Sequence, residues 1–295
     1  MYKAPKLKEN TQIVFKSRLK THIYPAFGEQ YLDEITTTDI QEFLNERKHL
    51  SKSTLDDLKN YLSQIFKGAM DEGLITTDPT DSKRLFNPSS KVEERKTLTD
   101  IQVADIIRNI PKLTNKNDRM LMAFLMFTGM RPSEIYGLQW ENIDRENMLI
   151  HVRHALVFAS NKSIFKDTKT QSGKRDIPLD PMLINYLEPF GESGFIFVRG
   201  KKYGHEGEPI TQQAHKRAWE RIKGTINVYG MVPYEARHTY LTALNNAGAD
   251  AKSLQTIAGH ANIKTTLTNY VHSSPEQIQK VGNMMHGRYE KMVAM

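Results

Sequence analysis

The chain has 295 residues, which is enough for two domains, and 39% of them are hydrophobic, which excludes an intrinsically disordered protein. No apolar run approaches the roughly 18 residues that a membrane span needs, and the first ten residues contain no apolar signal segment. The absence of cysteine excludes disulfides, thiolate chemistry and cysteine-ligated zinc, and it agrees with a reducing interior.

The net charge of +7 is unevenly distributed along the chain. Residues 1–94 carry 14 Lys and Arg against 15 Asp and Glu, whereas the remaining residues carry 27 against 19. A positive surplus favours a polyanion, usually nucleic acid, as the partner of the C-terminal two-thirds. A soluble basic protein without such a partner is the alternative that charge alone leaves open.

Three amphipathic stretches predict a helical bundle over residues 1–88. Threonines and an aspartate before the second stretch suit a helix N-cap, and Gly73 is a stop signal for the third. The apolar positions recur at helical spacing: Ile13, Phe15 and Leu19; Ile40, Phe43 and Leu44; Leu55, Leu58, Leu62, Ile65 and Phe66.

Residues 89–97 read as a linker, and a second unit is predicted over residues 98–295. It begins with an amphipathic helix, "LTDIQVADIIRNI", and continues with "DRMLMAFLMFTG", which is apolar nearly all round and predicts a buried helix. Between 147 and 179, β-branched and aromatic runs separated by turn signals predict a small three-stranded antiparallel sheet. Helical patterns resume after residue 180. The predicted fold class is therefore mainly α with a small antiparallel β-sheet.

The buried helix is followed by "TGMRPSEIYGL", in which Arg131 stands between a glycine and a proline. The chain turns sharply at such a break, so the side chain of Arg131 can point into a cleft. Glu134 lies three residues later and could orient the guanidinium. For a lone arginine, the favoured interpretation would be a surface residue at a helix start.

The next cationic cluster, Lys169, Lys174 and Arg175, surrounds a Gln-Ser-Gly turn in "TKTQSGKRDIPL". A hairpin tip with three cations can follow DNA phosphates, and a charged edge that resists aggregation is the alternative. Further on, Arg237 begins a predicted helix, and His260 and Tyr270 follow in "GHANIKTTLTNY". Each of these residues alone is more often a packing or surface group.

The sequence indicates no metal site and no cofactor. Carboxylates are not clustered, and His151 and His154 have a spacing that places them on opposite faces of a strand. A metal-dependent nuclease is therefore disfavoured.

Four motifs in order resemble the tyrosine recombinases, the integrase family of phages and transposons. They are "TGMRPSEIYGL", "TKTQSGKRDIPL", "EARHTYLT" and "GHANIKTTLTNY", and the resemblance extends from about residue 8 to the end. It implies that the N-terminal bundle is a helical core-binding (SAM-like) DNA-binding domain. Together with the catalytic domain it would form a C-shaped clamp around duplex DNA.

The resemblance also implies catalytic roles. Tyr270 would be the nucleophile that forms a 3′-phosphotyrosyl bond, and Lys169 would be the general acid on the hairpin. Arg131, Arg237 and His260 would stabilise the charge on the phosphate in place of metal ions. The bond energy is conserved in the phosphotyrosyl ester, so rejoining needs no ATP.

The resemblance implies double-stranded DNA attachment sites of a mobile element as the substrate. A homotetramer on paired sites is the expected assembly, with an excisionase or a host DNA-bending protein as a possible partner and no membrane association. The expected location is the bacterial cytoplasm, at the nucleoid. A further N-terminal domain that binds arm-type DNA sites, frequent in such integrases, is expected to be absent or removed.

The sequence departs from the family pattern three residues before the second arginine. A histidine is usual there, whereas this chain has Tyr234. The phenol is a poor base at neutral pH, so Tyr234 is expected to donate to a phosphate oxygen or to support Arg237. Packing of the ring alone is the alternative.

Two further expectations concern the ends of the chain. Lys52, Ser53 and Lys59, at the start of the third helix, are candidate DNA contacts because helix N-terminal amides favour phosphate. After Tyr270, a tail helix is expected to pack on a neighbouring protomer, with packing in cis as the alternative; its apolar positions are Ile278, Val281, Met284 and Met285.

Two other functions remain open at this point. A type IB topoisomerase would use the same chemistry on one strand at a time, without pairing two sites. A catalytically inactive DNA-binding relative is the other alternative, and it is disfavoured because all five predicted catalytic residues are present together.

Overall fold

The computed structural model describes residues 9–89, 97–159, 162–168, 173–199 and 207–270. The chain divides into two compact units, Met1–Glu94 and Arg95–Met295. Each unit has its own hydrophobic core and is described separately below.

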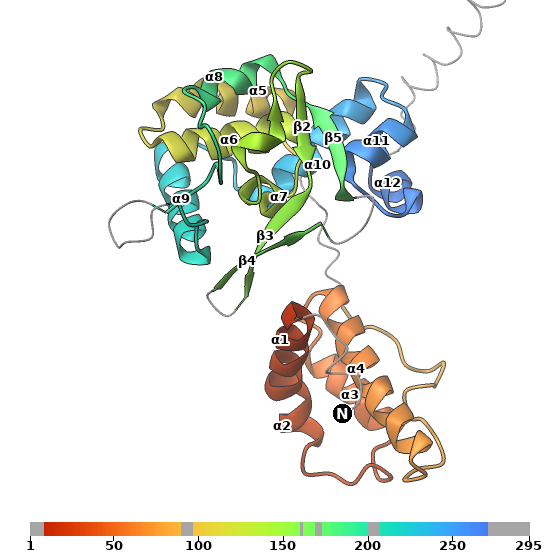
Figure 1. The fold of residues 1–295 in the computed structure, drawn as a ribbon. Helices are drawn as coiled ribbons and strands as arrows, with labels where there is room; N and C mark the ends of the chain where they lie inside the picture. The colour runs from red at the N-terminus through yellow and green to blue at the C-terminus, as the bar shows by residue number, and fades with distance from the viewer. Residues whose placement is uncertain (1–8, 90–96, 160–161, 169–172, 200–206, 271–295) are drawn as a thin grey trace, which may run out of the picture. The chain divides into compact units, whose positions relative to one another are not determined.

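The N-terminal unit is helical (Figure 1). Its elements are α1 (Glu9–Arg18), a π-helical segment η2 (Leu19–Ile23), α2 (Tyr24–Phe27), α3 (Thr37–Glu46) and α4 (Lys52–Asp71). The predicted apolar face of α3 is confirmed, since Ile40, Phe43 and Leu44 are all buried. In the first helix, by contrast, Ile13 is 40% exposed, so the predicted apolar face there begins only at Phe15.

Side-chain caps fix where the longer helices of this unit begin. Thr36 and Asp39 form a reciprocal capping box at the start of α3. The hydroxyl of Ser51 accepts the main-chain N–H of Thr54 at the start of α4. The helix boundaries therefore follow from short polar residues placed just before each apolar run.

The C-terminal unit combines helices with two small sheets (Figure 1). Its helices are α5 (Asp100–Asn109), η3 (Ile110–Lys112), α6 (Lys116–Thr128), α7 (Pro132–Tyr136), η4 (Trp140–Asn142), α8 (Pro181–Leu187), α9 (Gln212–Thr225), α10 (Pro233–Asn246), α11 (Ala251–Ala258) and α12 (Ile263–Tyr270). The prediction of a buried helix at α6 is confirmed, because every residue from Met120 to Thr128 is buried. Helix α6 packs against α8, α9 and α10 and is the centre of the core.

The prediction of one three-stranded sheet between residues 147 and 179 is wrong in its topology. The structure has a three-stranded antiparallel sheet in the order β1 (Ile143–Asp144), β2 (Leu149–Val152), β5 (Arg175–Pro178). A separate antiparallel pair joins β3 (His154–Ala159) to β4 (Lys162–Asp167). The first of the predicted strands, "MLIHVRHALVF" at residues 148–158, divides at Arg153, whose guanidinium donates to the carbonyl of Arg175 and pairs with Asp176.

No helix in the described part of the chain is long and apolar enough to cross a membrane. Within the ranges given above, no group of three or more His, Asp or Glu side chains is placed to hold a metal ion.

Candidate active site

Arg131 is positioned by the junction between α6 and α7. Gly129 ends α6 in the left-handed conformation, with φ at +62°, and Pro132 is the first residue of α7. One carboxylate oxygen of Glu134 accepts the main-chain N–H of Arg131 at 2.9 Å, and the other accepts its Nη1 at 2.7 Å. The carboxylate of Glu134 thus holds both the main chain and the guanidinium of Arg131, whose side chain remains 29% exposed.

Arg237 lies in the second turn of α10 and is fully buried. Its Nη1 donates to the carbonyl of Gly129 at 3.0 Å, and its Nη2 donates to the carbonyl of Ala258 and lies 3.2 Å from Nε2 of His260. Burial, and then the charge of Arg131, lower the pKa of Arg237 to about 10. Arg237 therefore stays charged at neutral pH even though it is enclosed.

His260 follows Gly259, which ends α11 with φ at +59°. Its Nδ1 lies 2.9 Å from the hydroxyl of Thr266, a fully buried residue of α12. Since Nε2 faces a guanidinium donor, Nε2 is the acceptor and Nδ1 carries the proton. Burial and the charge of Arg237 lower the pKa of His260 from 6.5 to about 4, so the imidazole is neutral at pH 7.

The end of α11 is a common acceptor for three arginines. The carbonyls of Ile257, Ala258 and Gly259 accept hydrogen bonds from Arg175, Arg237 and Arg131, respectively. The last carbonyls of a helix have no partner within the helix, and the helix dipole makes this end negative. The three arginines therefore meet where the backbone offers unpaired carbonyl acceptors that carry partial negative charge.

The prediction that Arg175 contacts DNA does not agree with the structure. Arg175 is only 6% exposed, and its Nη1 and Nη2 pair with the two oxygens of Glu134 at 3.1 and 2.9 Å. Side chains alternate across β5, so Arg175 points inward with Ile177 while Asp176 points outward. Counting this alternation back from Ile177 was the sequence signal that could have identified Arg175 as buried.

Lys174, the neighbouring candidate, is on the surface. Its side chain is 45% exposed, and its Nζ lies 2.8 Å from Asp167. The ion pair leaves Lys174 accessible to solvent, and its contact with DNA stays a prediction.

Glu134 is the one carboxylate that the structure shows in contact with this arginine cluster. Its burial raises its pKa, but the charge and hydrogen bonds of Arg175, followed by those of Arg131, outweigh burial and lower the pKa to about 2. Glu134 is consequently ionised at any physiological pH, and it partly balances three positive charges.

Tyr234 lies in the first turn of α10 and is 45% exposed. Its ring meets the edge of the buried His238 ring, with the two centroids 5.3 Å apart. Tyr234 is also close enough to Arg237 for the two side chains to interact electrostatically. Tyr234 is thus an exposed residue next to the arginine cluster.

The structure leaves two predicted catalytic side chains undescribed. Lys169 lies outside the described residues, in the connection between β4 and β5. Tyr270 is the last residue of α12, and only its main chain belongs to the described part. It follows Thr266 by four residues, about one helical turn, which places the two Cα atoms on the same side of α12. The predicted tail helix, with Ile278, Val281, Met284 and Met285, lies outside the described residues.

Comparison with known protein families gives two matches. Residues 96–277 match the model of the phage integrase family, and residues 1–47 match a phage integrase N-terminal SAM-like domain. The chain belongs to the phage integrase family. It is thus a tyrosine recombinase, and its mainly helical fold with small antiparallel sheets agrees with the predicted fold class.

Individual relatives agree with this assignment. The chain is 27% identical over 296 residues to the transposase of transposon Tn916 from Enterococcus faecalis, covering 92% of this chain and 71% of the relative. It is 28% identical over 254 residues to the tyrosine recombinase XerC of Lactobacillus delbrueckii subsp. bulgaricus, covering 83% and 81%. Among solved structures, the Tn1549 transposon integrase in complex with a circular intermediate DNA gives a TM-score of 0.76 at 25% identity, over 95% of this chain and 94% of that one.

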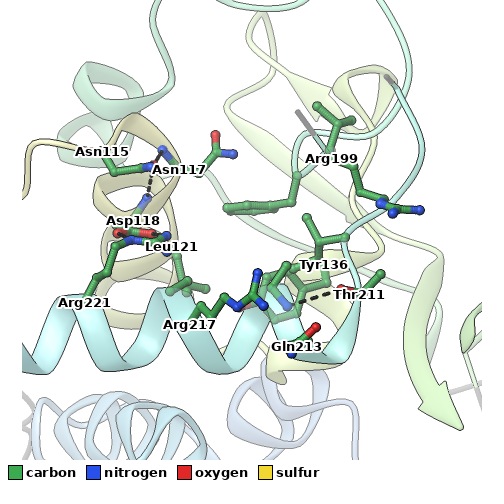
Figure 2. A pocket seen from close by; sticks show the side chains of 15 residues that line it. Asn115, Asn117, Asp118, Leu121, Tyr136, Arg199, Thr211, Gln213, Arg217 and Arg221 are labelled. Atoms are coloured by element: carbon green, nitrogen blue, oxygen red, sulfur yellow. Dashed lines mark hydrogen bonds and ion pairs between the residues drawn. The ribbon is translucent and has the colours of Figure 1, made fainter. Parts of the chain in front are cut away.

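A cavity of about 500 Å³ lies elsewhere in the recombinase, beside α9 (Figure 2). Its lining includes Arg199, Arg217 and Arg221, and Figure 2 shows Arg221 against Asp118. In Figure 1, α9 lies at the opposite end of the C-terminal unit from α11 and α12. The cavity contains none of the predicted catalytic residues, so it is separate from the arginine cluster.

In the N-terminal unit, the candidate DNA contacts of the recombinase lie at or near the start of α4. Lys52 and Ser53 are exposed in its first turn, and Lys59 is half-buried two turns later. The carbonyl of Lys52 accepts from the side chain of Asn87, while its ammonium group remains on the surface.

Proposed function

We propose that this tyrosine recombinase cuts and rejoins duplex DNA at the attachment sites of a mobile element, through a 3′-phosphotyrosyl intermediate. The observation that carries the proposal is the convergence of Arg131, Arg237 and His260 at the end of α11. Helix α12, which ends in Tyr270, is fixed to the same point through Thr266. The relatives act on DNA: the Tn1549 integrase was solved on a circular intermediate DNA.

The electrostatics of the cluster favour a phosphate. Three guanidinium groups face one carboxylate, Glu134, so the site carries an excess of positive charge that an anion would balance. Within the described residues, Nε of Arg237 is buried with no hydrogen-bond acceptor. A buried donor without an acceptor is costly, and a phosphate oxygen reaching it on DNA binding would remove that cost.

The proposed reaction replaces one phosphoester with another. The phenolic oxygen of Tyr270 bonds to phosphorus, the bond from phosphorus to the 5′ oxygen breaks, and the phenolic proton leaves to solvent. Lys169 donates a proton to the departing 5′ oxygen. Arg131, Arg237 and the neutral His260 stabilise the charge on the non-bridging oxygens, and rejoining reverses these steps.

The proposed assembly is the one expected from the resemblance to the tyrosine recombinases. The N-terminal unit acts as a core-binding domain, and the two units form a clamp around the duplex, with phosphate contacts from Lys52, Ser53, Lys59 and Lys174. Two pairs of protomers synapse two sites as a homotetramer, in which the tail helix packs on a neighbouring protomer. An excisionase or a host DNA-bending protein sets the direction, and the site of action is the nucleoid in the bacterial cytoplasm.

A nicked suicide substrate carrying the attachment site tests the chemistry. Release of the short strand after cleavage prevents rejoining, so a covalent protein–DNA adduct accumulates, and it should accumulate equally in EDTA. Absence of any adduct would indicate a DNA-binding protein that has no catalytic activity. Loss of the adduct in EDTA, restored by magnesium, would indicate a metal nuclease instead.

A second assay separates recombinase from topoisomerase. A plasmid with two attachment sites should yield exchanged products, and a plasmid without a site should keep its supercoils. Relaxation of the plasmid without a site, with no exchange on the other, would identify a type IB topoisomerase.

A further inference from the structure

The arginine cluster contains a third arginine, Arg175, whose role does not follow from contact with DNA. Its side chain is 3% exposed, and it reaches two distant segments of the chain as well as the turn just before its own strand. Nη1 and Nη2 pair with Glu134 on α7, Nε donates to the carbonyl of Ile257 on α11 at 2.8 Å, and Nη1 also donates to the carbonyl of Gly173 at 3.2 Å.

The first consequence concerns Arg131. Oε1 of Glu134 accepts from Nη1 of Arg131 at 2.7 Å and from Nη1 of Arg175 at 3.1 Å. Oε2 of Glu134 accepts from the main-chain N–H of Arg131 and from Nη2 of Arg175, both at 2.9 Å. Each carboxylate oxygen is therefore shared, and Arg175 fixes the plane of the carboxylate that orients Arg131.

The second consequence concerns the end of α11. Arg175 binds the carbonyl of Ile257, and the next two carbonyls bind Arg237 and Arg131. A Cβ atom placed on Gly259 would lie 2.8 Å from Nη1 of Arg175, so only glycine permits this approach of the helix end. Arg175 is thus one of three arginines that hold the helix end, and with it His260, the residue that follows Gly259.

We propose that Arg175 is a positioning residue for strand cleavage, acting through Glu134 on Arg131 and through the end of α11 on Arg237 and His260. This inference rests on the proposed function. A planar guanidinium fork is required, because the side chain must pair with both carboxylate oxygens and also reach a carbonyl behind them. Arg175 does not touch DNA, so its replacement should slow the chemical step and leave DNA affinity unchanged.

The chain offers a control in a second arginine–carboxylate pair. Arg221 pairs with both oxygens of Asp118, at 2.8 and 2.7 Å, and Asp118 is as buried as Glu134, whereas the Arg221 side chain is 51% exposed. This pair lies beside α9, away from α11 (Figures 1 and 2). Arg221→Met therefore reports what leaving a buried carboxylate without its arginine costs in stability alone.

The experiment compares Arg175→Met, Arg175→Lys and Arg221→Met. It measures the melting temperature, the Kd for attachment-site DNA, and the single-turnover cleavage rate on the suicide substrate at saturating DNA. Misplacement of reacting groups by about 1 Å costs on the order of 10²-fold in rate, and that loss is expected for Arg175→Met with Kd changed less than about twofold. Arg175→Lys should recover stability more than rate, and Arg221→Met should lose stability with a normal rate for the folded protein.

A double-mutant cycle adds a readout that a merely structural role would not change. If Arg175 acts through Arg131, Arg175→Met should cost far less in an Arg131→Lys background than in the wild type. A normal cleavage rate for the folded fraction of Arg175→Met, or losses that multiply independently in the cycle, would overturn the inference. If Arg175→Met does not fold, Arg175→Lys in the same cycle decides by the same criteria. Failure of the wild type itself to form an adduct would instead overturn the proposed function.

Discussion

The two units of the molecule differ in what they bury. In the described part of the N-terminal unit, the buried residues are hydrophobic apart from Thr80. The described part of the C-terminal unit also buries charged and polar side chains, which include Asp118, Glu134, Arg175, Arg237, His238 and His260. One unit is held together by apolar packing, whereas the other encloses an ionic cluster within its core.

This difference indicates which part of each unit carries its functional side chains. Burial of unpaired charge is unfavourable, so a buried cluster of arginines persists only when its partners are supplied by the fold. In the C-terminal unit, these partners are Glu134 and the carbonyls at the end of α11. The described part of the N-terminal unit encloses no such ionic cluster, so recognition there depends on its surface, and substitutions in the two units should therefore have different effects.

The largest expected effect is loss of the nucleophile. Tyr270→Phe should form no covalent adduct on the suicide substrate, because only the hydroxyl oxygen can bond to phosphorus. DNA binding in a gel-shift assay should match the wild type. A phosphotyrosyl adduct in this variant would show that another residue is the nucleophile.

The second prediction contrasts the two cores directly. Arg237→Lys should lower the single-turnover cleavage rate by about 10²–10³-fold, the usual cost of losing a transition-state donor. Leu58→Ala, in the apolar core of the N-terminal unit, should cost about 2–5 kcal/mol of unfolding free energy. Its folded fraction should cleave at the normal rate once DNA is saturating. A cleavage defect in folded, DNA-bound Leu58→Ala would contradict the inference that the N-terminal core contributes to stability and not to catalysis.

Tyr234 provides an intermediate effect. It is exposed next to the buried Arg237, so Tyr234→Phe should slow cleavage by roughly tenfold to a hundredfold if its hydroxyl contacts the phosphate. Unchanged cleavage by this variant would reduce Tyr234 to a packing residue against His238. Raised activity in Tyr234→His would indicate that the family's usual histidine still fits the site.

The buried ionic cluster should also give the C-terminal unit a distinctive acid sensitivity. The pKa of His260 is lowered from 6.5 to about 4, so the folded state binds this proton more weakly than the unfolded state. Folding is therefore increasingly disfavoured as pH falls from 6.5 towards 4. For Glu134, whose pKa is lowered from 4.5 to about 2, stability is full above pH 4.5 and is lost between 4.5 and 2.

The two pH windows can be separated by thermal denaturation. Between pH 7 and 4.5, His260→Gln should lose less melting temperature than the wild type, because the variant has no imidazole to protonate. The exposed His49 of the N-terminal unit is the matched control, and His49→Gln should follow the wild-type profile. Identical profiles for all three proteins would mean that His260 does not contribute to acid unfolding.

How far the sequence predicts this molecule also differs between the units. Apolar periodicity and caps predict α3 and α4 because those helices bury one simple face. The same reasoning predicts α6 as buried, and the four motifs identify Arg131, Arg237 and His260 as members of one site. Local sequence patterns therefore predict helices that bury apolar faces, and they predict site residues that belong to a recognisable motif.

The sequence does not predict the contacts that assemble the site. Arg175 looks like a surface cation next to a turn, and only pairing across 41 residues with Glu134 makes it a buried one. Likewise, the division of one predicted strand at Arg153 depends on its bonds to Arg175 and Asp176, which lie more than 20 residues away in sequence. The alternation along β5 can indicate that Arg175 is buried, but long-range ionic contacts have no local period, so no pattern within a window reveals which partners it meets.

The smallest expected effects lie on the surface of the N-terminal unit. If Lys52 or Lys59 contacts a phosphate, its replacement by alanine removes one released counterion, and the slope of log Kd against log salt should fall by about 0.9. Affinity should weaken to a similar extent for specific and non-specific DNA, since phosphate contacts carry no sequence information. Lys67 lies further along α4 and provides the control; Lys67→Ala should keep the wild-type slope. If all three variants keep that slope, the start of α4 does not contact DNA, and the apolar unit recognises its site through another face.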